Sequence, residues 1–118
     1  MTSPNTDPKK FGPELWRVIH VSAINMNQDE FIKWVTIQLN NIPCGNCRQH
    51  ALEYLRSSPP EVYKDVYDKS GEFIGMFKWT WMFHNEVNKR LGYKIMDYQM
   101  AYNLYNRQDV TCSETCGN

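Results

Sequence analysis

Hydrophobic residues recur at intervals of three and four along most of this chain, which is the spacing of one face of an α-helix. Pro13 stands in the first turn of the first such stretch, which predicts a helix over about residues 12–26. Asp29 can cap a second helix, whose apolar stripe includes Ile37 and runs to about residue 41. Both patterns are amphipathic, so each helix is expected to bury one side against a partner.

Two further helices are predicted in the middle and near the end of the chain. Pro43 is expected at the first position of a third helix, which the prolines of "RSSPP" end. Residues 59–71 carry two prolines and the tripeptide "KSG", which indicate an irregular link. Asp97 can cap a short helix that contains Tyr98 and Tyr102. No segment shows a strong strand pattern.

The fourth helical stretch, over about residues 72–91, has the strongest pattern. Phe77, Trp81 and Leu91 are expected on its buried side, and Gly92 supplies the left-handed residue that ends many helices. Four main helices with short links and one added helix predict an all-α fold, a four-helix bundle plus a short fifth helix.

The length and the distribution of polar residues predict a single domain with two tails. At 118 residues the chain is of ordinary domain size. Residues 1–10, with prolines and small polar residues, are expected to form a flexible N-terminal tail, and the folded domain to span residues 11–107. Residues 108–118 are expected to form a C-terminal tail that carries Cys112 and Cys116.

Charge and hydropathy exclude several kinds of partner. Lysine and arginine number 13, as do aspartate and glutamate, so we expect no nucleic acid or anionic membrane as a partner. The apolar runs fall well short of the ~20 residues that span a bilayer, and the N-terminus lacks the apolar centre of a signal peptide. We therefore expect a cytoplasmic protein, in which a C-x-x-C is more often catalytic or metal-binding than structural.

The stretch "NIPCGNCRQH" holds such a pair, Cys44 and Cys47. At a helix start, unsatisfied amides and the helix dipole stabilise a thiolate and lower the pKa of the thiol. The i,i+3 spacing places both sulfurs on one side of the helix, close enough to form a disulfide. The pair alone is compatible with redox chemistry, with a metal site, or with two cysteines that pack as small hydrophobic residues.

Zinc binding is the main alternative to redox chemistry. Cys44, Cys47 and His50, with a further histidine such as His84 or with the tail cysteines, would supply four ligands. The chain would then be a non-enzymatic interaction module stabilised by zinc. Against this hypothesis, the tail pair is a C-x-x-x-C in a polar segment and lacks the matched spacing of structural zinc sites.

Histidines beside aromatic residues indicate a planar ligand. The first helix has a tryptophan and a histidine at i,i+4, and the fourth has a tryptophan and a histidine at i,i+3 with two asparagines close by. A core seldom gathers so many hydrogen-bonding groups without a polar occupant. A planar heteroaromatic beside a dithiol suggests flavin, which can accept two electrons. The residues are Trp16, His20, Trp81, His84, Asn85 and Asn88.

Three motifs together resemble the Erv/ALR family of FAD-linked sulfhydryl oxidases over about residues 11–107. They are Gly12-x-x-x-Trp16-x-x-x-His20, "PCGNC" and "WTWMFHNEVNKRLG". In size the chain is most similar to the minimal members encoded by large DNA viruses. The resemblance implies a homodimer with noncovalent FAD at the mouth of the bundle. It also implies oxidation of protein thiols to disulfides, with electrons passing to dioxygen to give hydrogen peroxide, in a host cytoplasm or virion.

The resemblance also assigns roles to residues. Cys47 corresponds to the cysteine next to the flavin, and Cys44 to the one that exchanges with substrate. The Cys112 and Cys116 pair is similar to the shuttle disulfides of other members, but its spacing differs from their usual C-x-x-C, and a structural or incidental tail pair is the alternative. No residue is assigned to a metal. The positions implied to bind the cofactor are Gly12, Trp16, His20, Cys47, Trp79, His84, Asn85, Asn88, Leu91, Lys94 and Tyr105.

Two departures from the family pattern stand out. Pro13 occupies a position where the family often has arginine, and Lys9 or Lys10 is a candidate to replace its charge. Many cellular members also join the fourth helix to the following segment by a disulfide, and this chain has no cysteine near residues 82 or 98. Stability is therefore expected from packing, FAD and the dimer.

Overall fold

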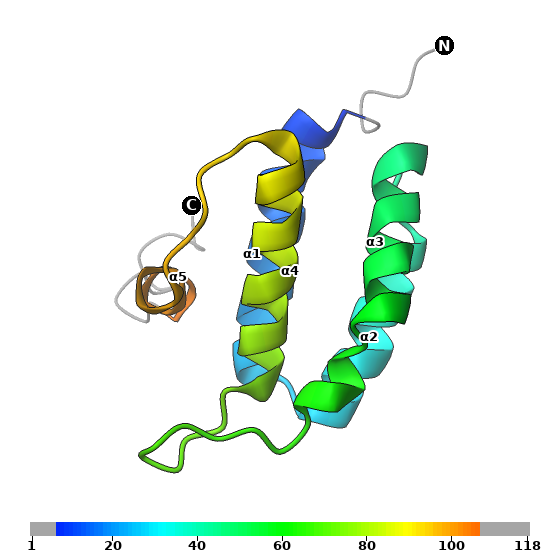
Figure 1. Ribbon diagram of the computed structural model, residues 1–118. Coiled ribbons are helices and arrows are strands. Elements are labelled where there is room, and N and C mark those ends of the chain that lie inside the picture. Colours follow the sequence, from blue (N-terminus) through cyan, green and yellow to red (C-terminus); the bar gives the residue numbers. More distant parts are fainter. Residues whose placement is uncertain (1–6, 107–118) are drawn as a thin grey trace, which may run out of the picture.

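The computed structural model describes residues 7–106, and over this range the chain is helical apart from its links and one isolated β-bridge (Figure 1). This arrangement confirms the predicted all-α class, with four long helices and a short fifth. The elements are α1 (Pro8–Asn25), α2 (Gln28–Asn40), α3 (Gly45–Ser57), the 3-10 helix η2 (Pro60–Tyr63), α4 (Gly75–Leu91) and α5 (Tyr98–Tyr105).

The four long helices form two pairs, α1 against α4 and α2 against α3 (Figure 1). The pairs are joined at one end by the turn from α1 to α2 and by the link from α3 to α4. They stand apart at the other end, where α3 begins and α4 ends. The short helix α5 packs against both α1 and α4. Among residues 7–106, no helix is long and apolar enough to cross a membrane.

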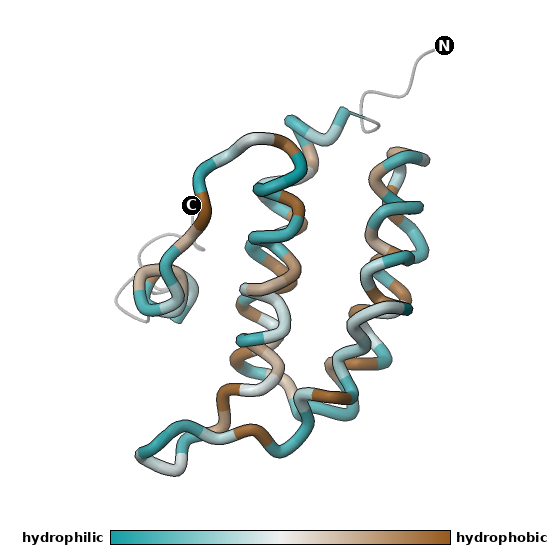
Figure 2. The backbone as a smooth tube through the Cα atoms, viewed as in Figure 1, coloured by the Kyte–Doolittle hydropathy of each residue, from teal (hydrophilic) through white to brown (hydrophobic). Residues whose placement is uncertain are grey.

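The core lies between the helices and uses one side of each, and Figure 2 shows hydrophobic and hydrophilic positions alternating along them. The buried positions differ from the predicted ones in α2 and α4. Ile37 is 59% exposed, because it lies about 200° around the helix from both Val35 and Leu39. Leu91 is 52% exposed at the end of α4. The buried hydrophobic residues are Ile19, Ala23, Phe31, Val35, Leu39, Ile42, Ala51, Met76, Phe77, Trp79, Phe83 and Ala101.

The helix α1 begins earlier than predicted, at Pro8. Asp7 is its N-cap, and the Asp7 carboxylate accepts a hydrogen bond from the Lys9 amide at 3.0 Å. Pro13 therefore lies inside α1 rather than in its first turn. Pro8 and Pro13 are both suited to the first turn of a helix, and the helix begins at Pro8 because Asp7 directly before it is a good N-cap.

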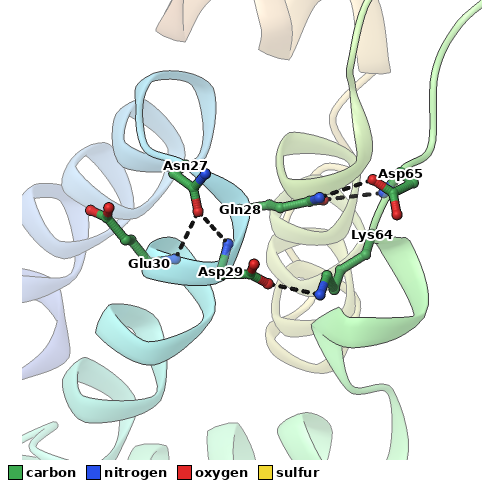
Figure 3. Close-up of polar contacts among 6 residues, drawn as sticks. All are labelled: Asn27, Gln28, Asp29, Glu30, Lys64 and Asp65. Carbon is green, nitrogen blue, oxygen red and sulfur yellow. Dashed lines mark hydrogen bonds and ion pairs between the residues drawn. The ribbon is translucent and has the colours of Figure 1, made fainter.

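The N-cap of α2 is Asn27 rather than the predicted Asp29 (Figure 3). The Asn27 side-chain oxygen accepts hydrogen bonds from the Asp29 and Glu30 amides. The Asp29 carboxylate instead forms an ion pair with Lys64, with 2.8 Å between Nζ and Oδ1. Both residues are capable caps, and the one directly before the first turn takes the role.

The link from α3 to α4 is held by specific contacts. The Gln28 amide donates to the Asp65 carboxylate at 3.0 Å and accepts from the Asp65 backbone N–H at 3.1 Å (Figure 3). At Gly75, where α4 starts, a Cβ would overlap the Tyr63 carbonyl oxygen of η2. Only glycine allows the link to approach the helix start this closely.

Candidate active site

The cysteine pair lies at the beginning of α3, but the helix starts at Gly45, two residues later than predicted. Cys44 is the N-cap, Pro43 precedes the helix, and Cys47 lies in the first turn. The Cys47 backbone N–H donates a hydrogen bond to the Cys44 sulfur at 3.3 Å. The sulfur of Cys44 therefore satisfies an amide of the first turn, a role that a serine or aspartate oxygen usually performs.

The two thiols have opposite pKa shifts. The pKa of Cys44 is lowered, first because the Cys47 thiol hydrogen-bonds to the Cys44 sulfur and then because the Cys47 amide does so. The pKa of Cys47 is raised to about 11, chiefly by burial and then by the hydrogen bond to Cys44, while the positive charge of Arg90 acts against this rise. The helix start thus favours a thiolate on Cys44 alone, and the shared proton stays on Cys47.

A groove of about 370 Å³ runs between α3 and α4. Its aromatic wall includes Tyr54 and Phe83, whose rings stack with centroids 4.8 Å apart at an angle of 12°. Arg90 is on the α4 side, and its charge acts on Cys47, which connects the groove with the dithiol. The lining residues are His50, Glu53, Tyr54, Ser57, Ser58, Phe83, Glu86, Val87 and Arg90. A second concavity, of about 400 Å³, is lined among the described residues by α3 alone and has no aromatic wall.

Four of the predicted cofactor residues come together where α1, α4 and α5 meet. The rings of Trp16 and His84 are stacked 3.9 Å apart and nearly parallel, at 3°. Nε2 of His20 lies 2.8 Å from Nδ1 of His84, and the Tyr105 ring stacks on His20 at 4.2 Å. Three separate helices therefore supply the rings of this aromatic cluster.

Both histidines of the aromatic cluster are neutral near pH 7. Burial, and then the neighbouring His84, lower the pKa of His20 to about 3. Burial lowers the pKa of His84 to about 4. His20 is completely buried, and His84 is half-buried. A neutral imidazole has one donor nitrogen and one acceptor nitrogen, so this pair can order a hydrogen-bond network without carrying charge.

Other predicted cofactor residues have structural partners. The Asn85 amide donates to the Met96 carbonyl at 3.0 Å and accepts from the Met96 N–H at 2.8 Å. Trp79 is fully buried, and its indole N–H donates to the Ser58 carbonyl at 2.7 Å. The polar groups of Asn85 and Trp79 thus form hydrogen bonds with the backbone of the protein itself.

The remaining predicted positions lie on α1, on α4 and in the segment just after α4. Asn88 is 7% exposed on α4, and Gly12 is half-buried on α1. Leu91, the last residue of α4, and Lys94, in the segment that follows it, are exposed. The pair formed by Cys112 and Cys116 lies outside the described residues.

Sequence reasoning missed three side chains of this region. Phe83 and Arg90 are seven residues apart and so share one face of α4, the face that lines the groove. Thr80 is completely buried, and its hydroxyl lies 2.9 Å from Nδ1 of His20. The i,i+4 spacing shows from the sequence that Thr80 and His84 share a face of α4. Their common contact with His20 of α1 could not be read from the sequence.

Zinc ligands do not assemble in the part of the chain that the structure describes. Among residues 7–106 there is no group of three histidine, cysteine, aspartate or glutamate side chains that could hold a metal ion. His50 is exposed on α3, whereas His84 packs against α1 through Trp16. The set of Cys44, Cys47, His50 and His84 is therefore not assembled in this part of the chain, and the alternative set with Cys112 and Cys116 lies outside the described residues.

The structure combines a helical bundle, two cysteines with opposite pKa shifts and a groove with an aromatic wall. These features define a class of protein, the all-α thiol–disulfide redox proteins with a site for a planar organic cofactor. Comparison with known families makes the assignment specific. The sequence pattern of the Erv1/Alr family matches residues 13–108, and the chain belongs to this family.

Similar proteins are found in large DNA viruses. A protein of African swine fever virus (isolate Tick/Malawi/Lil 20-1/1983), named FAD-linked sulfhydryl oxidase, is 34% identical over 111 residues, which cover 88% of this chain and 87% of the relative. The protein of the same name from isolate Pig/Kenya/KEN-50/1950 is 34% identical over 104 residues, 82% of this chain and 81% of the relative. A protein of invertebrate iridescent virus 6 is 28% identical over 108 residues, 80% of this chain and 91% of the relative.

Proposed function

We propose that this chain is an FAD-dependent sulfhydryl oxidase that converts pairs of thiols in substrate proteins into disulfides. The observation that carries the proposal is the unequal pair of Cys44 and Cys47 at the start of α3, next to a groove with an aromatic wall. Membership of the Erv1/Alr family and similarity to viral proteins named FAD-linked sulfhydryl oxidase support it.

The residues present fit FAD. A groove of about 370 Å³ is within the range of small-molecule pockets, roughly 300–1,000 Å³. Tyr54 and Phe83 offer aromatic contact for one planar ring system. The stacked rings of Trp16 and His84 offer a flat surface for a second one. We propose that these two regions hold the two ring systems of the dinucleotide.

The pKa difference between the cysteines suits thiol–disulfide exchange. Starting from the oxidised pair, a substrate thiolate attacks the Cys44 sulfur, the bond to Cys47 breaks, and Cys47 leaves as a thiolate. A second substrate thiolate then attacks the sulfur of the first, which forms the product disulfide and releases Cys44. Because its pKa is lowered, Cys44 is a good leaving group in this second step.

The exchange leaves two electrons on the cysteine pair. The chemistry that FAD supplies when bound is acceptance of these two electrons and their transfer to dioxygen, which gives hydrogen peroxide. The positive charge of Arg90 favours the thiolate form of Cys47 against the effect of burial. Two substrate thiols and one dioxygen thus give one disulfide and one hydrogen peroxide.

The absorption spectrum of the purified protein is the first test. The proposal predicts a yellow protein that releases FAD on denaturation, whereas a colourless protein that a chelator unfolds would support the zinc module instead. The variant Cys47→Ser is expected to retain the flavin absorption and to lose oxygen consumption with dithiothreitol. Full oxygen consumption in that variant would refute the assigned role of Cys47.

A homodimer and a cytoplasmic site of action are also proposed, on the family resemblance. Val18 and Ile37, which are 45% and 59% exposed on α1 and α2, are apolar residues that a second copy could cover. Sedimentation equilibrium of the purified protein checks the dimer, and a single species with the mass of one chain would refute it. Similarity to viral proteins suggests a host cytoplasm or virion, which fractionation of producing cells would check.

The tail cysteines are proposed to relay electrons from bulky substrates to Cys44. The double variant Cys112→Ser and Cys116→Ser is expected to slow oxidation of a reduced protein while oxidation of dithiothreitol continues at the original rate. Equal rates on both substrates in the variant and the parent would show that the tail pair has no such role.

A further inference from the structure

The buried hydroxyl of Thr80 determines the direction of a chain of hydrogen bonds. Its oxygen lies 2.7 Å from the Phe77 carbonyl oxygen and 2.9 Å from Nδ1 of His20. A carbonyl oxygen can only accept, and a hydroxyl has a single hydrogen. The Thr80 hydroxyl must therefore donate to Phe77, which leaves it as the acceptor of a hydrogen bond from His20. The ring proton of His20 is consequently on Nδ1.

The same reasoning extends to the second histidine. His20 is completely buried, and burial keeps it neutral, so its single ring proton is the one on Nδ1. Its Nε2 is then an acceptor, and Nδ1 of His84, 2.8 Å away, must donate to it. Because His84 is also neutral, its own Nε2 carries a lone pair and no proton.

The outer nitrogen of His84 is available to a ligand. Among the described residues, no group forms a hydrogen bond with Nε2 of His84, and no buried nitrogen or oxygen lacks a partner. This nitrogen therefore reaches the surface of the half-buried ring. The stacked Trp16 ring, at 3.9 Å, holds the plane of the imidazole and so fixes where the lone pair points.

We propose that Thr80 is a positioning residue that sets the tautomers of His20 and His84, so that His84 presents an acceptor-only nitrogen to the bound cofactor. Such a nitrogen binds an N–H or O–H donor, as found in the amine and hydroxyl groups of a nucleotide, and repels a carbonyl or phosphate oxygen. The tautomers follow from the contacts of this chain alone, and only the consequence for cofactor binding rests on the proposed function.

Nitrogen NMR of the ring atoms tests the tautomers directly. The chain has three histidines, so long-range ¹H–¹⁵N spectra of the labelled holoprotein are simple to assign, and His50→Gln identifies the third ring. The expected result is a proton on Nδ1 and none on Nε2 for both His20 and His84. A proton on Nε2 of His84 in the parent protein would overturn the proposal.

Two variants separate the hydroxyl from the shape of the side chain. Thr80→Val replaces the hydroxyl by a methyl group, so Nδ1 of His20 loses its acceptor and both ring protons are expected to move to Nε2. Thr80→Ser retains the hydroxyl and is expected to keep both protons on Nδ1. A valine variant whose ring protons stay on Nδ1 would overturn the role of Thr80. If that variant does not fold, the parent spectrum still decides the direction.

Release of FAD from the diluted holoprotein tests the consequence for the cofactor. Flavin fluorescence is expected to rise roughly five- to tenfold faster for Thr80→Val, which corresponds to one lost hydrogen bond, and at the parent rate for Thr80→Ser. Equal rates in the parent and Thr80→Val would refute the cofactor contact. A parent protein without flavin would refute the proposed function instead, and the ring spectra would still test Thr80.

Discussion

The dithiol and the aromatic cluster are built in different ways. Cys44 and Cys47 lie on one helix start, and the contact between them is local in sequence. The pair of His20 and His84 joins two helices at a sequence separation of 64 positions, and a third helix covers it through Tyr105. The reactive groups are thus set by a few neighbouring residues, whereas the aromatic cluster depends on the whole bundle. Mutations at the dithiol are therefore expected to change activity without changing stability, whereas mutations in the aromatic cluster are expected to change both.

The largest expected effect is on activity at the dithiol. Cys44→Ser should lower thiol oxidation by at least ~10²-fold, because a hydroxyl is a far poorer nucleophile and leaving group than a thiolate near pH 7. The free energy of unfolding should change by less than about 1 kcal/mol, because the side chain is half-buried and serine is a good N-cap. Oxygen consumption and urea unfolding measure the two quantities. A large loss of stability would show that the dithiol is also part of the core.

The second prediction concerns stability at the aromatic cluster. His20→Ala removes a fully buried ring and leaves Nδ1 of His84 without its hydrogen-bond partner, while the Thr80 hydroxyl keeps only its bond to the Phe77 carbonyl. The expected loss in the free energy of unfolding is about 3 kcal/mol or more. The control is Lys33→Gln on the exposed side of α2, which should be neutral. Unfolding in urea provides the measurement. A His20→Ala variant with an unchanged free energy of unfolding would show that the aromatic cluster does not hold the bundle together.

Acid should weaken the aromatic cluster before it affects the dithiol. The pKa of His20 is about 3 in the folded chain and 6.5 when unfolded, so the unfolded chain binds the extra proton between these values. The contribution of His20 to the free energy of unfolding is therefore fully present above pH 6.5. It falls as the pH is lowered towards 3, by up to about 1.4 kcal/mol per pH unit. His84 acts in the same direction.

Urea unfolding at several pH values measures the slope. A parent protein whose unfolding midpoint does not change between pH 6.5 and pH 4.5 would show that the buried imidazoles bind a proton in the folded state.

The smallest effect is expected at the exposed pair of Asp29 and Lys64. Their charged atoms are 2.8 Å apart, but the side chains are 63% and 38% exposed. Water and salt screen such pairs, so Lys64→Gln should lower the melting temperature only slightly, and less still in 1 M salt. Thermal unfolding at low and high salt measures this change. A large shift would mean that the link at η2 contributes more to stability than its exposure indicates.

Local signals made much of the fold predictable. Gly92 adopts φ 76° and ends α4, and Asp97 caps α5 through the Met100 amide, both as the residue types indicated. The start of α1 and the cap of α2 were misplaced because two nearby residues could each perform the role, Pro8 or Pro13 in α1 and Asn27 or Asp29 in α2. Ile37 was assigned to the wrong side because hydrophobicity alone does not fix the phase of a helix.

The aromatic cluster was predictable only in part. Trp16, His20 and His84 are recognisable because they share helical spacing and a family motif, and the structure brings them together. The groove between α3 and α4 was not predictable, because Tyr54 of α3 and Arg90 of α4 line the same groove only once the two helices pack together. The partner of Asn85 was also hidden, since a backbone group at Met96 has no signature in the sequence.

The contact of Asn85 with Met96 has a consequence for how this segment can vary. Three hydrogen bonds hold the Met96 backbone just before α5: its carbonyl accepts from the Asn85 amide and from the Trp81 indole, and its N–H donates to the Asn85 side-chain oxygen. Backbone groups are common to nearly all amino acids, so these bonds tolerate almost any residue at position 96 except proline, which has no N–H. The hydrogen bonds of Asn85 therefore place no demand on the side chain at position 96, and the packing of Met96 against the core is a separate constraint.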